Sequence, residues 1–213
     1  MTEKWKRCKV MKNIKFIGDI HGCYNHYKQL AYGYDGITIQ VGDFGLGFGM
    51  PPPEIDEGNF FIRGNHDDPT KCKEHPNYLG DFGYVKEEDL FFLGGADSID
   101  KALRVEGVSW WRDEQLTYNQ FSDALDLYRK VKPKIVVTHD CPIEIKKGCI
   151  RPEYSNDEWT STQQALQVMW QYEHHKPDLW IFGHYHPKQI KTFRLEGTKF
   201  VCLPIFGVYE HER

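Results

Sequence analysis

The sequence predicts an α/β fold in which two packed, mixed β-sheets are flanked by helices. Two observations predict it: short apolar runs rich in Ile, Val and Phe recur along the chain, and segments with helical periodicity lie between several of them. A length of 213 residues is enough for one well-buried domain and too short for two comfortable ones. We therefore expect a single domain that spans residues 1–213.

Eight short apolar runs have the composition of buried strands, which are enriched in β-branched and aromatic residues. In chain order they are Ile14–Ile17, Ile37–Val41, Phe60–Ile62, Leu90–Leu93, Ala102–Val108, Ile135–Thr138, Leu179–Phe182 and Lys199–Leu203. The first runs alternate with helical segments, whereas later runs follow one another, and this order favours two packed sheets.

Three segments between these runs are expected to form helices: Tyr24–Tyr32, Asn119–Val131 and Ser161–His174. The third has a start signal, because Thr160 is followed three residues later by Gln163, the spacing of a capping box. Four of its residues recur at helical spacing and predict one buried face: Ala165, Val168, Met169 and Tyr172.

Three other segments are expected to lack regular structure. Residues 1–12 carry several Lys and Arg side chains and are predicted to form a basic tail. Phe44–Gly58 is rich in glycine and contains Pro51–Pro53, and Asp68–Asp81 is polar. Both of these loops directly follow polar motifs, so we expect them to rim the functional site and to influence substrate choice.

The composition narrows the class of protein. A net charge of −4 gives no electrostatic reason to expect dedicated nucleic-acid binding. No apolar run is long enough for a signal peptide or a membrane span, so no membrane partner is expected. The six cysteines form no Cys-x-x-Cys pair, which predicts reduced thiols in a cytoplasmic protein.

Five polar motifs follow predicted strands. They are Gly18-Asp19-Ile20-His21-Gly22, Gly42-Asp43-Phe44-Gly45, Gly64-Asn65-His66-Asp67, Thr138-His139-Asp140 and Gly183-His184-Tyr185-His186. In α/β sheets, ligands bind beyond the carboxyl ends of the strands, where these motifs are expected to lie. Carboxylates and imidazoles at such positions, next to glycines that clear the backbone, predict a metal site.

The motif side chains combine carboxylate and carboxamide oxygens with imidazole nitrogens, a donor set that suits Mn, Fe, Zn, Co or Ni better than Ca or Cu(I). Seven such donors exceed what one ion needs while keeping a position for water, so they predict two divalent ions bridged by a carboxylate. The negative charges of two aspartates do not fully neutralise two divalent ions, so the site keeps a net positive charge. This charge favours phosphate esters as substrates, with a metal-bound hydroxide as the nucleophile.

The motifs, their order and their places at strand ends resemble those of the calcineurin-like metallophosphoesterase superfamily, over about Ile14 to His186. The chain is most similar to stand-alone bacterial and phage members and to the Ser/Thr protein phosphatase branch. The resemblance implies a four-layer αββα sandwich and a metal-dependent phosphoesterase with two divalent ions, of which Mn is the expected metal.

The resemblance also implies a role for each motif residue. The first ion would be held by Asp19, His21 and His186, and the second by Asn65, His139 and His184, with Asp43 as the bridge. His66 would be the general acid that protonates the leaving group. Asp67 would orient His66 and raise its pKa, which would keep the imidazole protonated near pH 7.

Two arginines are candidate substrate-binding residues. Arg63 precedes Gly64, as an arginine does in the protein phosphatase branch, and could bind a phosphate bidentately or pair with an acid. Arg112 is the second candidate. After Asp43 that branch has an Asp-Arg-Gly, where this chain reads Phe-Gly-Leu-Gly-Phe-Gly, and its third motif ends in Glu instead of Asp67. A phosphoprotein substrate is therefore open.

These inferences leave three functions to compare. The leading one is phosphomonoesterase activity on a small molecule, a nucleotide or a phosphoprotein. The second is a nucleotide phosphodiesterase or nuclease, against which the acidic balance of the chain weighs. The third is a non-catalytic interaction scaffold, against which the presence of His66 and of every expected ligand weighs.

Overall fold

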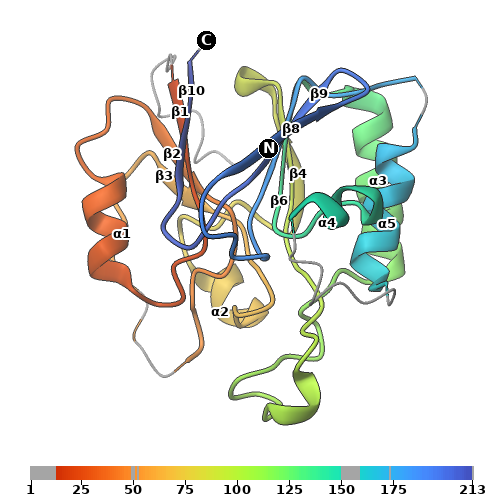
Figure 1. The fold of residues 1–213 in the computed structure, drawn as a ribbon. Helices are drawn as coiled ribbons and strands as arrows, with labels where there is room; N and C mark the ends of the chain where they lie inside the picture. Colours follow the sequence, from red (N-terminus) through yellow and green to blue (C-terminus); the bar gives the residue numbers. More distant parts are fainter. Residues whose placement is uncertain (1–12, 49–50, 52, 150–158, 173, 213) are drawn as a thin grey trace.

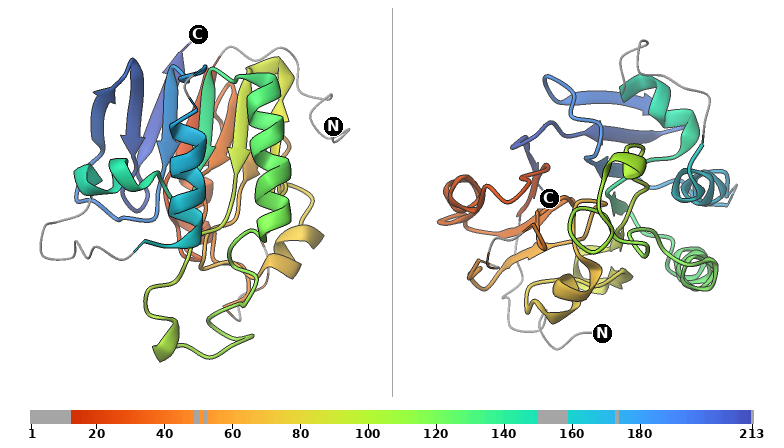
Figure 2. Two further views of the ribbon diagram at one scale, coloured as in Figure 1. Left: turned by 90° about the vertical axis from the view of Figure 1, so that its right-hand side faces the viewer. Right: turned by 90° about the horizontal axis from the view of Figure 1, so that it is seen from below.

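Two β-sheets pack face to face, and helices cover the outer face of each sheet (Figures 1 and 2). The computed structural model describes residues 13–48, 51, 53–149, 159–172 and 174–212. The predicted basic tail over residues 1–12 lies outside these ranges, as do three residues of the predicted loop Phe44–Gly58. The arrangement confirms the predicted α/β fold with two mixed sheets flanked by helices.

The smaller sheet has four strands in the order β10-β1-β2-β3. Their bounds are β1 (Asn13–Ile17), β2 (Ile37–Gln40), β3 (Asn59–Phe61) and β10 (Val208–Glu212). The first three are parallel, and β10 pairs with β1 in the antiparallel direction. Two helices on this side, α1 (Tyr24–Ala31) and α2 (Pro69–Glu74), contribute buried residues to the core outside this sheet.

The larger sheet has six strands in the order β4-β5-β6-β7-β9-β8. Their bounds are β4 (Phe82–Val85), β5 (Leu90–Leu93), β6 (Ile135–Thr138), β7 (Leu179–Phe182), β8 (Lys191–Leu195) and β9 (Thr198–Cys202). The four central strands are parallel, and the edge strands β4 and β8 are antiparallel to their neighbours. Its outer face is covered by α3 (Tyr118–Val131), α4 (Ile143–Cys149) and α5 (Ser161–Trp170).

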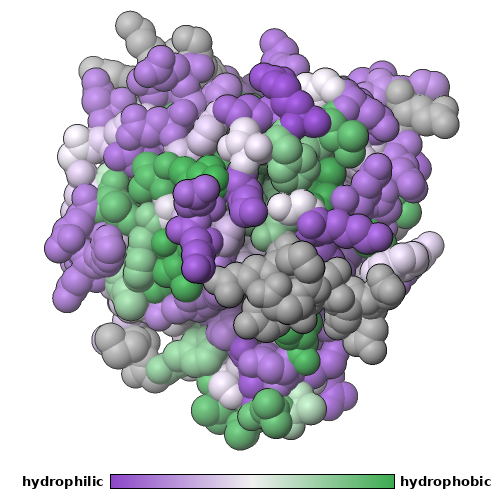
Figure 3. Space-filling view, viewed as in Figure 1, coloured by the Kyte–Doolittle hydropathy of each residue, from purple (hydrophilic) through white to green (hydrophobic). Residues whose placement is uncertain are grey.

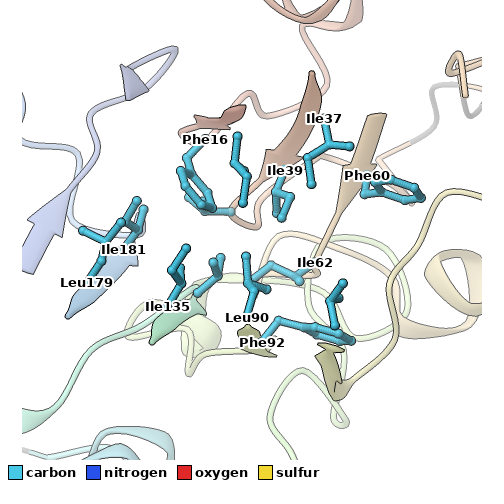
Figure 4. Packing of buried hydrophobic residues seen from close by; sticks show 14 of the residues in the cluster. Phe16, Ile37, Ile39, Phe60, Ile62, Leu90, Phe92, Ile135, Leu179 and Ile181 are labelled. Carbon is cyan, nitrogen blue, oxygen red and sulfur yellow. The ribbon is translucent and has the colours of Figure 1, made fainter. Parts of the chain in front are cut away.

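The strands of the larger sheet are buried on both faces, which explains their continuous apolar sequences. In β5, Leu90 and Phe92 face the smaller sheet, whereas Phe91 and Leu93 face the helices, as the two-residue period of a strand requires. Figure 4 shows the layer between the sheets, where side chains such as Ile39 from the smaller sheet meet Leu90 and its neighbours from the larger sheet.

One predicted strand is wrong. Ala102–Val108 lies in a segment between β5 and α3, residues 96–116, which extends below the body of the molecule in Figure 1. It forms the 3₁₀ helix η3 (Lys101–Leu103) and turns. The apolar side chains that suggested a buried strand are exposed instead, since Leu103 is 90% and Val105 62% exposed. Figure 3 shows apolar surface at this end of the molecule.

The remaining differences involve short or polar elements. The loop predicted over Asp68–Asp81 contains α2, whose first turn is capped by the Asp68 carboxylate. Strands β4, β8 and β10, helix α4 and the 3₁₀ helix η2 (Lys86–Glu88) were not predicted. Both β8 and β10 are mostly exposed edge strands with few buried side chains, so their sequences lack a long apolar run.

The third predicted helix begins as expected and buries a partly different face. Thr160 and Gln163 form the predicted capping box at the start of α5. The helix ends at Trp170 rather than His174. Val168, predicted to be buried, is 49% exposed. Met169 is buried as predicted, and the other buried residues of the helix are Thr162, Gln163, Leu166 and Trp170. Among the described residues, no helix is long and apolar enough to cross a membrane.

The packing between the sheets predicts a large effect of truncating Ile39, which is fully buried in that layer. Ile39→Ala should lower the free energy of unfolding by about 2–5 kcal/mol, because the lost contacts leave a cavity that close-packed strands fill poorly. The matched control is Ile99→Ala, since Ile99 is 85% exposed and should change stability by less than about 0.5 kcal/mol. Urea denaturation measures both, and equal effects would contradict this description of the core.

Candidate metal centre

Five strands from both sheets end at the same place, and the residues that follow them form the candidate site. Asp19 follows β1, Asp43 follows β2 and Asn65 follows β3 of the smaller sheet. His139 directly follows β6, and His184 follows β7 of the larger sheet. The site therefore lies beyond the carboxyl ends of parallel strands, as ligand sites in α/β folds usually do.

One group of potential metal ligands combines Asp19, His21, Asp43 and His186, whose ligand atoms lie within 4.8 Å of one another. The Nε2 atoms of His21 and His186 are 3.0 Å apart. His186 Nε2 is also 2.8 Å from the Oδ2 atom of Asp19, and His21 Nε2 is 4.0 Å from that oxygen. Two imidazole nitrogens thus converge on one carboxylate oxygen.

The second group combines Asp43, His139 and His184. His139 Nε2 is 3.2 Å from Asp43 Oδ1 and 3.3 Å from the carboxamide oxygen of Asn65. The other nitrogen of His139, Nδ1, lies 2.9 Å from the carbonyl oxygen of Val41 and donates to it. That hydrogen bond orients the ring and leaves Nε2 facing the Asp43 and Asn65 oxygens, which is how metal-binding histidines are commonly held.

Backbone strain is concentrated at these residues. Four of the predicted ligands have a positive φ, in the left-handed region that non-glycine residues rarely adopt: His21 (44°), Asp43 (57°), His184 (68°) and His186 (45°). The motif glycines give the ligands room. A Cβ atom on Gly64 would overlap the Asp43 carboxylate, and one on Gly183 would overlap the Asp19 carboxylate.

The electrostatics of the site fit a cation. Burial opposes ionisation of Asp43, but the imidazoles of His139, His66 and His21 outweigh it and hold the pKa of Asp43 below its usual range. Burial likewise opposes protonation of His139, and the Asp43 and Asp19 carboxylates overcome it and raise the pKa of His139. Two carboxylates with four imidazoles and an amide oxygen suit divalent first-row ions, which would replace the protons on these imidazoles.

His66 lies beside the two groups without belonging to either. Its backbone N–H donates to Asp43 Oδ1 at 2.8 Å, and its ring makes an edge contact with His21, with centroids 4.9 Å apart. The guanidinium of Arg104 lies against the same ring, with Nη2 2.7 Å from His66 Nε2. Phe48 stacks on the His66 ring at a centroid distance of 5.7 Å.

A sequence model of calcineurin-like phosphoesterases matches residues 12–188. The chain belongs to the calcineurin-like phosphoesterase family. Members of this family are typically dinuclear and metal-dependent, and the side chains that converge in this structure are of metal-binding types. The family that the motifs indicated in the sequence is therefore confirmed. No curated protein matches it.

Among the solved structures similar to this chain, one has a TM-score of 0.50, and two have slightly lower scores. A candidate 5′-nucleotidase from Staphylococcus aureus in complex with α-ketoglutarate has a TM-score of 0.50 and 16% identity, covering 93% of this chain and 50% of that one. The phosphopantetheinyl hydrolase of Mycobacterium tuberculosis has a TM-score of 0.49 and 14% identity, and the match covers 92% of this chain and 91% of that one. GAP50, an inner membrane complex anchor of Plasmodium, has a TM-score of 0.48 and 12% identity, and the match covers 90% of this chain and 71% of that one. The phosphoesterase thus spans half the length of the first of these proteins.

Asp67 of this phosphoesterase has contacts that differ from the expected ones. Its two carboxylate oxygens accept hydrogen bonds from the backbone N–H groups of Phe44, Gly45, Leu46 and Gly64, at 2.6–3.1 Å. The carboxylate therefore shapes the loops that follow β2 and β3, and the contact to the His66 ring comes from Arg104 instead. Burial and the charge of Asp43 raise the pKa of Asp67 to about 6.

The pKa expected for His66 also needs correction. Burial lowers the pKa of His66 to about 4, and the Arg104 cation adds to the decrease, although the Asp43 carboxylate opposes it. The sequence predicted an increase because it placed the Asp67 carboxylate beside the ring. In this structure the ring is partly buried next to the Arg104 cation, and both features favour the neutral imidazole.

Arg63 is a structural residue. Its side chain is 2% exposed, Nε donates to Asp81 Oδ1 at 2.8 Å, and Nη1 donates to the carbonyl oxygens of Asp113 and Glu114. The Arg63 carbonyl oxygen accepts from Gly95 N at 2.7 Å. Arg63 thereby holds both ends of the 96–116 segment, and of the two alternatives considered for this residue the structure shows pairing with an acid.

Arg112, the other candidate for substrate binding, points into solvent. Its side chain is 81% exposed and pairs with Glu106 at 3.0 Å. The arginine that the structure places at the site is Arg104, which is six-fold less exposed, at 13%, and is also paired with Asp100. Sequence patterns do not point to Arg104, because the apolar composition of Ala102–Val108 predicts a buried strand there. No local sequence pattern indicates that the segment between β5 and α3 brings Arg104 to His66.

The ion pair of Arg63 and Asp81 predicts a pH-dependent contribution to stability. Burial opposes ionisation of Asp81, but Arg63 and a hydrogen bond from Tyr78 hold the pKa of Asp81 below its usual range. A depressed folded-state pKa gives a contribution that is complete above the unfolded pKa of about 3.9 and is lost as the pH falls through the folded value. Asp81→Asn should therefore lower the free energy of unfolding by on the order of 3 kcal/mol at pH 7 and by progressively less below pH 4.

Urea denaturation between pH 7 and pH 3 checks this expectation. Asp126→Asn is the control, because Asp126 is 74% exposed in its pair with Arg129 and should change stability by less than about 1 kcal/mol. A difference between wild type and Asp81→Asn that stays constant into acid would show that the ion pair is not its origin.

Proposed function

We propose that this phosphoesterase hydrolyses phosphate monoesters with two divalent ions. One ion is held by Asp19, His21 and His186, the other by Asn65, His139 and His184, and both share Asp43. The observation that supports this division is that Asp43 belongs to both groups of potential ligands. A shared carboxylate between two ligand groups is what a two-ion site requires.

Manganese is the proposed metal, because the donor set is hard oxygen plus imidazole and lacks a thiolate. When bound, the two ions supply Lewis-acid activation of water and neutralise the charge of the phosphate. Each ligand residue fits this use, since the buried carboxylates and the amide oxygen face the imidazoles rather than solvent.

The charges beside the ions support a monoester as substrate. A phosphate monoester carries up to two negative charges near neutral pH, one more than a diester. Arg104 adds a cation next to His66, and a guanidinium can bind phosphate oxygens through two parallel hydrogen bonds. We infer that the substrate phosphate takes over the hydrogen bonds that Arg104 makes to Asp100 and His66.

His66 is the proposed acid that protonates the leaving oxygen. The neutral ring is favoured beside Arg104. A bound phosphate would bring negative charge against the ring and would engage Arg104, and both changes favour the imidazolium. The pKa of His66 in the substrate complex is then closer to the pH at which a general acid works best.

A reducing compartment is the proposed location. All five cysteines within the described residues are free thiols, which supports a cytoplasmic protein.

Parallel hydrolysis of p-nitrophenyl phosphate and bis-p-nitrophenyl phosphate tests the proposed function. The protein is stripped with a chelator and then given Mn²⁺, Ni²⁺, Zn²⁺ or Mg²⁺ in turn. Metal-restored turnover with the monoester preferred would support the proposal. A preference for the diester would instead support a phosphodiesterase or nuclease, and two bound ions without turnover of either ester would support a scaffold.

The division between ligands and acid predicts two different defects. Asp43→Asn should lose metal and activity together, because the substitution removes the shared carboxylate charge. His66→Gln should keep both ions while lowering turnover by roughly 10²–10⁴-fold on esters with poor leaving groups. Metal content after gel filtration and turnover measured on the same samples check both, and loss of an ion from His66→Gln would mean that His66 is a ligand.

Arg104 and Arg112 provide a matched pair on one segment. Arg104→Ala should lower kcat/KM for a monoester by about 10–100-fold, since a hydrogen bond to a charged group contributes about 1.5–3 kcal/mol. Arg112→Ala should leave kcat/KM unchanged, because Arg112 is exposed and pairs with Glu106. Steady-state kinetics of the two variants compares them, and equal losses would exclude a specific phosphate contact by Arg104.

A further inference from the structure

The side chain of Asn65 has two unlike ends, and only one of them can face a cation. Its carboxamide oxygen lies 3.3 Å from His139 Nε2, in the second ligand group. Its amide nitrogen lies on the other side, 3.0 Å from the Oγ atom of Ser98. If the amide group turned over, it would present two N–H donors to the ion instead of an acceptor.

Ser98 is held by a carboxylate. The backbone N–H of Ser98 donates to Glu114 Oε1 at 2.9 Å, and its hydroxyl donates to Glu114 Oε2 at 2.6 Å. All three side chains are buried, with exposed fractions of 3% for Asn65, 1% for Ser98 and 2% for Glu114. Ser98 and Glu114 belong to the 96–116 segment, more than thirty residues along the chain from Asn65.

These contacts fix a direction for the hydrogen bonds. A carboxylate oxygen accepts hydrogen bonds, so the single proton of the Ser98 hydroxyl is donated to Glu114. The Ser98 oxygen is then left as an acceptor, and it can pair with the N–H end of Asn65 but not with the oxygen. The two hydrogen bonds that Glu114 accepts from Ser98 thereby decide which end of the Asn65 carboxamide faces His139.

The position of Glu114 is itself fixed by the fold. Its backbone carbonyl accepts a hydrogen bond from Arg63 Nη1, and Arg63 immediately precedes the Gly64-Asn65 motif. The two ends of this hydrogen-bonded path are thus attached to the same loop after β3. A buried, fully connected path of this kind resists reorganisation, because an unpaired buried polar group costs about 1–3 kcal/mol.

We propose that Ser98 and Glu114 are positioning residues that orient the Asn65 oxygen toward the second metal ion. The inference rests on the proposed two-ion function. It assigns to the 96–116 segment an indirect part in metal binding, through Asn65, although neither residue belongs to a ligand motif. Partners that orient a metal ligand typically change metal affinity by 10–100-fold when they are removed.

Two variants test the path at different points. Ser98→Ala removes the acceptor for the Asn65 amide. Glu114→Gln keeps the volume but places an N–H donor where one carboxylate oxygen was, which favours the opposite direction of the whole path. Both should lower the affinity for the second ion by about 10–100-fold and leave the affinity for the first ion close to that of wild type.

The control is Thr38→Val. Thr38 Oγ1 donates to the Asn59 carboxamide oxygen at 2.7 Å, which is also a buried bond between a hydroxyl and an asparagine. Thr38 lies in the β2 strand rather than in a motif. This variant should lose stability without losing either ion.

The experiment titrates Mn²⁺ into the chelator-stripped 213-residue protein by calorimetry, and it records the Mn²⁺ electron paramagnetic resonance spectrum at each ratio. Wild type should bind two ions and give the signal of a spin-coupled pair. Ser98→Ala and Glu114→Gln should show the signal of isolated Mn²⁺ at ratios where wild type and Thr38→Val show the coupled pair.

The outcomes separate the inference from the function on which it rests. Two ions bound by wild type, and by Ser98→Ala and Glu114→Gln with unchanged affinities, would overturn the positioning role and leave the two-ion function in place. Fewer than two ions bound by wild type would overturn both. If one variant fails to fold, the other decides alone, because each interrupts the same path.

Discussion

The candidate site depends on the burial of one carboxylate, that of Asp43, where the two sheets meet. An ionised carboxylate removed from water costs several kcal/mol unless partners compensate it. The partners of Asp43 come from other strand ends: the His66 N–H from the loop after β3 and His139 from the end of β6. Its backbone oxygen accepts from Ile20 N and His21 N in the turn after β1. The two sheets are therefore connected through one acidic residue.

Asp67 shows how the same fold uses a second buried acid for a different purpose. It is as buried as Asp43, but its partners are backbone N–H groups instead of imidazoles. The loops after β2 and β3 thereby take their shape from one carboxylate, and the Asp43 carboxylate next to it remains for cations. Two aspartates in neighbouring motifs thus have separate roles, because one faces imidazoles of the candidate site and the other faces the backbone.

The parts of this structure that the sequence predicts are those with a local signal. Apolar runs predicted strands such as β5 and β6, because both faces of these strands are buried and each run is complete in itself. The motif residues Asp19 and His184 could be placed together, because the carboxyl ends of parallel strands meet. The strand predicted over Ala102–Val108 is wrong because its apolar residues are exposed, and composition alone does not distinguish an exposed apolar run from a buried one.

The arginines show a limit of a different kind. Arg63 immediately precedes a motif, and this position left both a phosphate contact and pairing with an acid open. Arg63 is instead buried and bonded to Asp81 and to Asp113 in the 96–116 segment. These partners are distant in sequence, so no local pattern indicates them. The same holds for Arg104 and Ser98, which reach His66 and Asn65 from a segment that lies outside every motif. One segment thus contacts both neighbouring motif residues, the proposed acid and a proposed ligand. Since its ends are held by Arg63, the residue just before that motif, the proposed roles of His66 and Asn65 share the same few supporting hydrogen bonds.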